Sequence, residues 1–569
     1  MQNKKEMAAY GVVAFVFMFF QLACRALEVQ GNVNWNVRSI LMCVGISIGF
    51  AAITVFVLWA VNRWMQNVFG KKNIQKQQTI TKTQKVFWVS WAVIFVCWLP
   101  VFLAYYPGIL AYDSYVQIEQ ILTGAYNNHH PLFHTFLIEV FMDLGNVLGR
   151  ANLGVAIYTV VQMLVLSGTM AFGVLLLSKK GVSRAWLILV VLLCSLNPAN
   201  SYLAISMTKD VYFTVFFLWF VFCLLKLLEK EKHHPMWDCI YVAVTVFMIL
   251  FRNNGMYALL VCLCLYVFFA FLGFCFGKKK RAGEDGSIRK EKRKRFWFFL
   301  AETMLGIFIS VLILGGLNKS VGAQDGDKRE MLSIPIQQIA RTMVYHGGVN
   351  VNAEDDNSLS DADKALINEF LLSEGYLQYD PIISDPVKRN TNTWVVLNKM
   401  KEFVSMYVRL ALDYPGEYVN AFLAVNGGYL SVFDESHGQV NLRGDEMGLG
   451  YLQTRWELST ISKANISKDS KWPALYEKLE KFASDNGYLD IPLVRQIVAP
   501  GLYLWCYAVF AVWAYFKREK QLLLPLYFVI GYYITLVLGP TVQLRYLYPL
   551  MVLLPFYFLY VLYSRKKET

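Results

Sequence analysis

Long apolar runs, separated by shorter polar stretches, fill most of the chain. Crossing a bilayer as a helix takes roughly 20 apolar residues, and by that measure we identify twelve candidate spans. They cover approximately residues 8–29, 39–62, 86–105, 153–178, 185–205, 209–229, 236–251, 256–276, 296–316, 496–516, 520–539 and 546–563. The first run follows a basic stretch but is long and lacks a small-residue cleavage site, so we expect it to be a retained span. The pattern predicts an all-α polytopic membrane protein.

One further apolar stretch, residues 132–149, is interpreted differently. It carries Glu139 and Asp143 four residues apart, and a lipid-facing helix would hold these charges only at a high free-energy cost. Counting it as a span would also move the basic loop 178–184 to the outer side of the membrane. We therefore expect an interfacial helix that lies along the membrane surface.

The distribution of charge supports this topology. The chain is 56% hydrophobic and has a net charge of +13, yet residues 321–490 hold 25 acidic and only 16 basic residues. The positive excess lies in short loops between the spans, which is typical of the cytoplasmic loops of membrane proteins. We predict that both termini are cytoplasmic and that the large polar segment lies outside a plasma membrane. Membrane lipids, and not nucleic acid, are the expected partners of the basic loops.

This topology divides the chain into four parts. We expect two N-terminal helices with a basic loop (1–85), a core with an outer loop at 106–152 (86–316), an extracytoplasmic domain (317–495) and three C-terminal helices (496–569). Residues 317–495 mix helical patterns with loops rich in Gly, Asn and Asp, so mostly helix and loop is expected there. All ten cysteines fall in or beside candidate spans, so no disulfide framework is indicated for that domain.

The polar stretch YYPGILAYDSYVQIEQ, residues 105–120, directly follows the third candidate span. Ser114 and Gln117 fit a capping box at the start of a short interfacial helix. Asp113 would then be a carboxylate near a helix N-terminus, where the helix dipole favours the ionised form. An aspartate at the start of a helix is more often a helix cap than a functional residue, and Asp113 taken alone would be interpreted in that way.

Other polar residues on the same predicted side change that interpretation. Single charges at span ends are usually anchors, but basic residues on the outer side run against the usual charge bias. Several cations there indicate an anionic ligand, and phosphate suits Arg as a bidentate donor and Lys as a point charge. The residues concerned are His129, His130 and His134, Thr208-Lys209-Asp210, Arg252-Asn253-Asn254-Gly255, and Arg545-Tyr546.

A metal site is a second interpretation of the histidines. His130 and His134 are four residues apart, which is compatible with metal ligation, but a proline lies between them and a third ligand is missing. A polar edge on a surface helix is the commoner explanation of such a pair. The alternative is that Asp113 and His130 share a divalent cation, Mg or Mn, with a bound phosphate.

The order of these motifs resembles the GT-C superfamily of integral-membrane glycosyltransferases, such as the dolichyl-phosphate-mannose protein mannosyltransferases and the bacterial aminoarabinose transferases. The resemblance is greatest to a bacterial branch of membrane proteins with the pattern P-G-x₄-D-S-x₂-Q. Many GT-C members have a paired acidic motif, whereas Ser114 follows Asp113 here. The matching motifs are Pro107-Gly108 to Asp113-Ser114 and Gln117, His130-Pro131, Lys209-Asp210, Arg252-x-Asn254-Gly255, Pro335-x-Gln337 and Arg545-Tyr546-x-x-Pro549.

The resemblance implies transfer of a sugar from a polyprenyl-phosphate donor to an extracytoplasmic glycan, polymer or protein, with inversion. Asp113 would be the general base or a metal ligand. Lys209, Arg252 and Arg545 would stabilise the charge of the departing lipid phosphate. The remaining substrate-binding candidates are Gln117, His130, Asn254 and Tyr546.

Two other functions fit parts of the pattern. A polytopic transporter or lipid flippase also has about twelve spans, and the polar stretch SLNPANSY (195–202) within the fifth candidate span favours it. The charged clusters, however, lie at span ends. An O-antigen ligase or polymerase-like enzyme also has a large late outer loop, but it would not depend on an early aspartate such as Asp113.

Overall fold

The chain folds into helices joined by loops. The structure is a computed structural model that describes residues 4–69, 83–229, 235–276, 286–326, 328–349, 357–432, 439–442, 448–484 and 487–564. Within these ranges there is no β-strand, and only isolated β-bridges link extended segments. The predicted all-α class is confirmed. Of the basic stretches between the candidate spans, residues 71–82, 230–234 and 277–285 lie outside the described residues, whereas residues 286–295 begin a helix.

In the described part of the chain, nine helices are long and apolar enough to cross a membrane. The helices α7 (Arg184–Leu196) and α8 (Pro198–Ile205) meet that criterion only when taken together, and they bend by 52° at their junction, as in a broken span or a re-entrant loop. The multi-pass membrane character of the chain is thus confirmed. The nine are α1 (Lys4–Gln30), α2 (Val37–Phe69), α3 (Thr83–Ala104), α6 (Ala151–Lys179), α9 (Lys209–Glu229), α11 (Asn254–Phe276), α12 (Gly286–Ser320), α23 (Leu524–Val537, preceded by the 3₁₀ turn η7, Lys520–Leu523) and α24 (Leu544–Leu562).

The predicted count of twelve spans is not confirmed. Two of the predicted runs are helices outside this set, namely α10 (Pro235–Phe251), which has 17 residues, and α22 (Pro500–Lys517). The helix predicted to lie on the surface, α5 (Leu132–Val147), is also outside the set. Its 16 residues reach about 24 Å, less than the roughly 30 Å of a hydrocarbon core.

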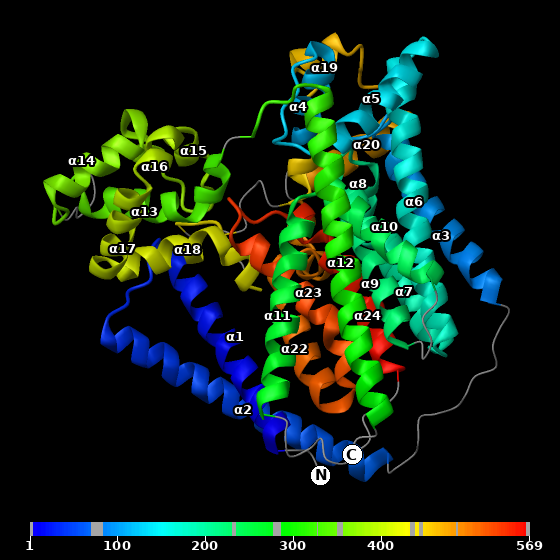
Figure 1. Ribbon diagram of the computed structural model, residues 1–569, viewed down its shortest axis with the longest axis horizontal. Coiled ribbons are helices and arrows are strands. Elements are labelled where there is room, and N and C mark those ends of the chain that lie inside the picture. The colour runs from blue at the N-terminus through cyan, green and yellow to red at the C-terminus, as the bar shows by residue number, and fades with distance from the viewer. Residues whose placement is uncertain are drawn as a thin grey trace.

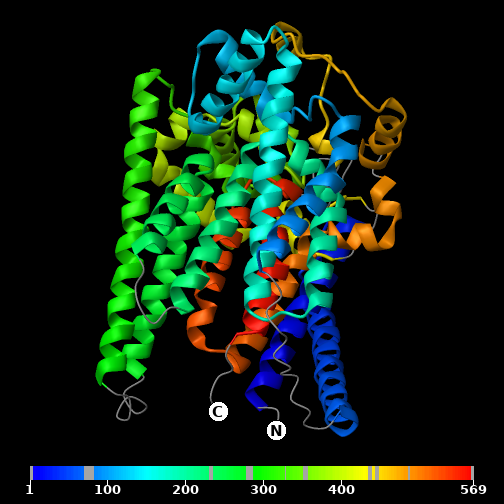
Figure 2. The ribbon, with the colours of Figure 1, turned by 90° about the vertical axis from the view of Figure 1, so that its right-hand side faces the viewer.

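The helices α9 and α24 lie at the centre of the bundle. Buried residues make up 72% of the span in α9 and 78% in α24, compared with 6% in α2. α9 and α24 pack against each other and both contact α6, while α10 packs on α9 and α11 packs on α23. Figures 1 and 2 show α24 enclosed by its neighbours and the α1–α2 pair leaning away from the bundle. The central helices can therefore hold charges away from lipid.

The two chain ends lie at one end of the bundle, which we call the terminal end (Figure 1). The opposite end, the domain end, carries α4 (Tyr112–Thr123), α5 and the helices of the late polar segment. Backbone bonds between Ile109 and residues 205–207 join the loop before α4 to the loop before α9. This pairing places the start of α4 beside the start of α9.

The predicted domain 317–495 is two separate bodies in the structure. The lateral domain, residues 328–430, has its own apolar core and projects to one side of the bundle (Figure 1). The cap segment, residues 448–497, packs its apolar side chains into the core of the bundle instead. The lateral domain contains η2 (Lys328–Leu332), α13 (Ser333–His346), α14 (Asp361–Phe370), η3 (Leu372–Gln378), α15 (Asp385–Arg389), α16 (Thr393–Asn398), α17 (Met400–Asp413) and α18 (Pro415–Leu430). The cap segment contains η5 (Gly450–Leu452), α19 (Ser459–Lys463), α20 (Pro473–Ser484), η6 (Gly487–Asp490) and α21 (Pro492–Ile497).

Candidate functional site

Four charged residues that are far apart in the sequence meet at the domain end of the bundle. Asp113 lies in the first turn of α4, Lys209 opens α9, Arg252 follows α10 and Arg545 is the second residue of α24. The sequence analysis predicted that they lie on one side of the membrane, and the structure brings them together. With Asp210, the second residue of α9, we call them the charge cluster.

Asp113 is held by two cations. Its Oδ2 atom lies 2.7 Å from the Lys209 ammonium and 2.8 Å from Arg545 Nη1, and its Oδ1 atom lies 3.3 Å from Arg545 Nη2. Burial alone would raise the pKa of Asp113, but the Arg545 guanidinium and the Lys209 ammonium hold that pKa well below its usual range. Asp113 is thus ionised, buried and, in this arrangement, a weak base.

The start of α4 differs from the predicted capping box. The cap residue is Ala111, and no side chain caps this helix end. The Ser114 hydroxyl donates instead to the backbone carbonyl of Met207, which lies two residues before Lys209. The capping-box prediction is wrong because a long-range partner takes the hydroxyl. The bond ties α4 to the segment that carries Lys209.

Asp210 was named with its neighbours in the sequence but was given no role in binding or catalysis. Its side chain is fully buried and is paired with Arg252, while Arg545 Nη1 lies 3.5 Å from Oδ2. The Thr208 hydroxyl donates to the same carboxylate at 3.1 Å. Adjacent Lys and Asp at the start of an apolar helix were the available signal, because only a buried partner stabilises an acid there.

Tyr546 lies between two guanidinium groups. The centre of its ring is 4.3 Å from Arg252 Cζ and 4.9 Å from Arg545 Cζ. Its hydroxyl accepts from Arg545 Nη2 at 3.3 Å, and Gln543 accepts from Arg545 Nε at 2.6 Å. An aromatic face can hold two like charges close together because each cation is attracted to the ring.

Among the residues that the structure describes, the cluster holds more cations than carboxylates. Its three cations, Lys209, Arg252 and Arg545, face the two carboxylates Asp113 and Asp210. The buried ring of His130 adds no charge, because burial and the nearby Lys209 ammonium hold its pKa well below the usual range. Lysine has no acceptor atom, so His130 Nδ1 accepts from the ammonium at 2.9 Å. A net charge of about +1 in a largely buried site attracts an anion.

His134 and Gln117 belong to a neutral network beside the cluster. The His134 ring is fully buried, with Nδ1 2.9 Å from Gln117 Oε1 and Nε2 2.8 Å from the Tyr158 hydroxyl. Burial lowers the pKa of His134 to about 3, so the ring is neutral. Gln162 extends the network to the carbonyls of Ala204 and Ser206. His134 is therefore a packed structural residue, and the predicted polar edge is wrong for it.

The residues proposed to hold a divalent cation do not fit one. Both ring nitrogens of His134 have partners, and the Lys209 ammonium lies between His130 and Asp113, whose own atoms are 4.0 Å apart. Across the described residues, no group of three or more His, Cys, Asp or Glu side chains is arranged to hold a metal ion. Lysine supplies the positive charge at this position.

Two other predicted residues lie away from the charge cluster. Asn254 opens α11, and its amide is 3.5 Å from the Thr535 hydroxyl. The Pro335-x-Gln337 motif lies in α13 of the lateral domain, where the Gln337 amide donates to the carbonyl of Asp380. Both side chains contact neighbouring parts of the fold.

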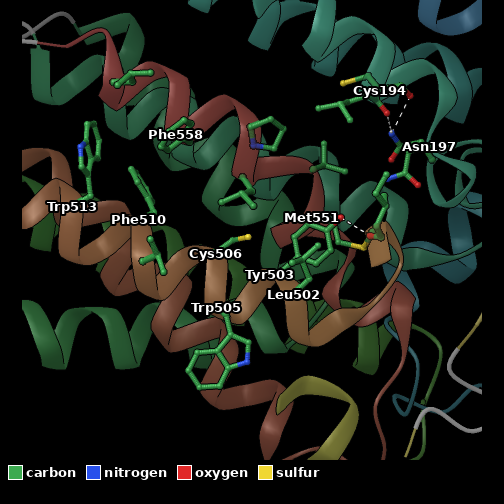
Figure 3. Close-up of a pocket in the computed structure, with 18 of the residues that line it drawn as sticks. Cys194, Asn197, Leu502, Tyr503, Trp505, Cys506, Phe510, Trp513, Met551 and Phe558 are labelled. Carbon is green, nitrogen blue, oxygen red and sulfur yellow. Dashed lines mark hydrogen bonds between the residues drawn. The ribbon is translucent and has the colours of Figure 1, made fainter. Parts of the chain in front are cut away.

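An apolar pocket of about 790 Å³ lies among α22, α24 and the bend between α7 and α8. Figure 3 shows Trp505, Phe510 and Trp513 of α22 on one side, with Met551 and Phe558 of α24 across from them. Met551 follows Arg545 by six residues on the same helix, a rise of about 9 Å. An apolar space of this kind inside a membrane protein suits a hydrocarbon chain.

A sequence profile described as a family of unknown function (DUF6020) matches residues 122–569, which is well over half of the chain. The chain belongs to this family. No curated protein and no solved structure matches it at a significant level. The matched region of this DUF6020 chain includes His130, Lys209, Arg252 and Arg545, whereas Asp113 lies nine residues before the match begins.

Proposed function

We propose that this DUF6020 chain is a membrane glycosyltransferase that moves a sugar from a polyprenyl-phosphate donor to an extracytoplasmic glycan, polymer or protein. The observation that carries the proposal is the charge cluster, in which Lys209 of α9, Arg252 after α10 and Arg545 of α24 face two carboxylates. A phosphate group supplies the missing negative charge, and Arg545 can bind two of its oxygens at once. The domain end is then the outer side of a plasma membrane, with both termini in the cytoplasm.

The apolar pocket supports a lipid-linked donor. Its lining is almost wholly apolar and it runs beside α24, the helix that also presents Arg545 to the charge cluster. An isoprenoid chain in this pocket would keep the phosphate near the domain end. A water-soluble sugar phosphate would bring no group that uses this space.

The proposed mechanism begins by displacing Asp113 from its cations. Lipid phosphate binds Lys209 and Arg545, which in this structure hold Asp113. Once it is released, the carboxylate becomes a stronger base because its stabilising charges are now shared with phosphate. Asp113 then accepts the proton of the acceptor hydroxyl while the hydroxyl oxygen bonds to the anomeric carbon. The bond from that carbon to the phosphate oxygen breaks, and the lipid phosphate leaves with the electron pair, stabilised by the three cations.

A transporter or lipid flippase is the second candidate, and the bend between α7 and α8 favours it. Broken helices often surround transport sites within the bilayer. Here Asn197 accepts from the Ala199 amide at 3.0 Å, and Asn200 donates to the carbonyls of Leu193 and Cys194. The polar groups at the bend thus bind one another, so we rank the transferase first.

The deciding experiment compares the lipids bound to two purified proteins. Wild type and Asp113→Asn are extracted in mild detergent, and their lipids are identified by mass spectrometry. We expect a polyprenyl-phosphate sugar to accumulate in the variant, since it binds donor but does not complete transfer. Asp469→Asn is the matched control, because Asp469 is an exposed carboxylate paired only locally with Lys471. Bulk phospholipid alone in all three samples would favour the transporter.

A further inference from the structure

Helices α16 and α17 of the lateral domain carry large apolar side chains on their exposed surface. Trp394 and Leu412 are 74% and 75% exposed. In α17 the exposed apolar residues recur every fourth position, so they share one side of the helix. The complete set, which we call the apolar row, is Trp394, Leu397, Met400, Val404, Val408 and Leu412.

The apolar row is additional to the face that α17 buries. Phe403, Met406 and Leu410 pack into the core of the lateral domain. At 100° per residue, the apolar row begins about 60° from Phe403 and covers about 120° of the helix, with Lys401 lying among its members. The polar side chains of Arg409 and Glu402 occupy the remaining side. A surface helix in water needs one apolar face to pack on its domain. The second apolar face of α17 indicates a contact beyond the domain core.

The position of α17 identifies the surface that this row contacts. The next helix, α18, packs against α1 and α22. The Trp35 indole donates to Asn420 of α18 at 2.9 Å, and a Cβ atom on Gly416 would come within 3.2 Å of the same ring. Trp35 is two residues before α2 begins, so it marks the domain end of that span. The end of α17 is three residues from Gly416 and therefore lies near the membrane boundary.

The orientation and surroundings of α17 agree with a position near the membrane boundary. Figure 1 shows α17 running across the direction of the spans, close to the end of α1 at the domain end. The first turns of α2 expose Val37 and Leu41, which are 74% and 64% exposed in a helix that lipid must surround. The apolar row thus continues an apolar surface that already faces lipid. A tryptophan at one end of such a row is typical of a membrane interface.

We infer that α16 and α17 dock the lateral domain onto the lipid leaflet at the domain end, with the apolar row inserted among the outermost parts of the acyl chains. α17 is then an interfacial helix with its axis in the plane of the membrane. Its apolar row faces the hydrocarbon, and Glu402 and Arg409 face water. The contact holds the lateral domain against the membrane at a second point, separate from the packing of α18 on α1. This inference is independent of the proposed transferase activity.

Spin labels on α17 test the inference directly. The full chain, with a single cysteine added as Val408→Cys or as Glu402→Cys, is labelled and placed in nanodiscs that hold one copy each. Wild type treated in the same way gives the background from the native cysteines. Collision of each label with oxygen, which concentrates in hydrocarbon, is compared with collision with a water-soluble nickel chelate. Val404→Cys is a second reporter from the apolar row, in case the first variant does not fold.

We expect the labels at 408 and 404 to favour oxygen over the nickel chelate and the label at 402 to favour the chelate. Equal access of all labels to the chelate would overturn the inference, because α17 would then be surrounded by water. Exclusion of both reagents from 408 and 404 would also overturn it, since the row would then be covered by protein. In detergent-free nanodiscs the two sides of one helix serve as each other's control.

Discussion

Two buried arginines of this protein have different electrostatic surroundings. In the lateral domain, Arg341 is fully buried and donates to Glu417 at 2.7 Å, to the Tyr379 hydroxyl and to Asn32. In the charge cluster, Arg545 shares the carboxylate of Asp113 with Lys209. Among the described residues, Arg341 thus shares the Glu417 carboxylate only with the His346 ring, at 3.6 Å, whereas Arg545 shares the Asp113 carboxylate with the Lys209 ammonium.

The difference separates a structural arginine from a binding one. Arg341 joins the lateral domain to the loop between α1 and α2, where it also donates to the carbonyl of Gly31. Its charge is matched by that of Glu417, so no additional anion is required. The charge cluster has one more cation than it has carboxylates, and a buried excess of charge is costly unless a ligand offsets it. Charge balance around a buried arginine, and not burial alone, is therefore the useful indicator of function.

The largest loss of stability is expected from Arg341→Met. The change removes the buried cation that Glu417 contacts at 2.7 Å, and because the Glu417 side chain is 13% exposed we expect a cost of about 3 kcal/mol, the lower end for a buried pair. Thermal unfolding in detergent should show a large fall in the melting temperature. The double variant Arg341→Met/Glu417→Leu should recover part of the loss, because no unpaired charge remains. A melting temperature close to that of wild type in the single variant would contradict the structural role of Arg341.

Asp113→Asn should act in opposite directions on binding and on transfer. Removing the carboxylate releases Lys209 and Arg545 to bind phosphate, so we expect affinity for a short-chain polyprenyl phosphate to rise about tenfold, or about 1.4 kcal/mol. Transfer should fall by about 10²–10⁴-fold, because no general base remains. Native mass spectrometry measures the binding.

The control for this prediction is Asp469→Asn, which should change neither quantity. Weaker phosphate binding in Asp113→Asn would contradict the displacement of Asp113 by the donor. Asp113 would then serve to position the two cations for the ligand.

The sequence predicted where the charged residues gather, but not how they pair. Apolar periodicity and the bias of basic loops predict that Asp113, Lys209, Arg252 and Arg545 lie on one side of the membrane, and in the structure these residues lie together. Neither the apolar periodicity nor the charge bias of the loops predicts which carboxylate pairs with which cation. The roles of Asp210 and of the Tyr546 ring depend on how α9, α10 and α24 pack, and that packing is a long-range property.

The incorrect predictions have the same physical origin. The Ser114 hydroxyl fits a local cap but finds a better-placed carbonyl in Met207, 93 residues away. His134 fits a polar edge by spacing but is enclosed by Gln117 and Tyr158. The polar segment 317–495 was predicted as one domain, but its apolar side chains belong to two different cores. Composition does not reveal which helices share a core. Local patterns therefore predicted the elements well and their partners poorly.

His134→Gln should flatten the pH dependence of stability. The folded pKa of His134 is about 3, far below the value of about 6.5 expected in the unfolded chain. As the pH falls below 6.5 the unfolded state gains a proton that the folded state does not, so folding becomes less favourable. At pH 5 this costs the wild type about 2 kcal/mol. Melting temperatures between pH 7 and pH 5 should fall less steeply in the variant.

The exposed His129 provides the matched control for this measurement. His129→Gln should retain the steep fall of the wild type, because this ring lies at the surface. An unchanged slope in His134→Gln would mean that the ring can be protonated in the folded protein. The neutral network with Gln117 and Tyr158 would then be wrong.

The smallest effect is expected from Tyr546→Phe, which keeps the ring between Arg252 and Arg545 and removes only the hydroxyl. One hydrogen bond from Arg545 is lost, so binding of the polyprenyl phosphate should weaken by about fivefold or less, near 1 kcal/mol. Tyr546→Leu removes the ring as well and should cost clearly more, because two guanidinium groups lose their shared aromatic face. Titration of both variants with the same ligand measures the difference. Equal losses of affinity in the two variants would show that the Tyr546 hydroxyl, and not its ring, keeps the arginines in place for binding phosphate.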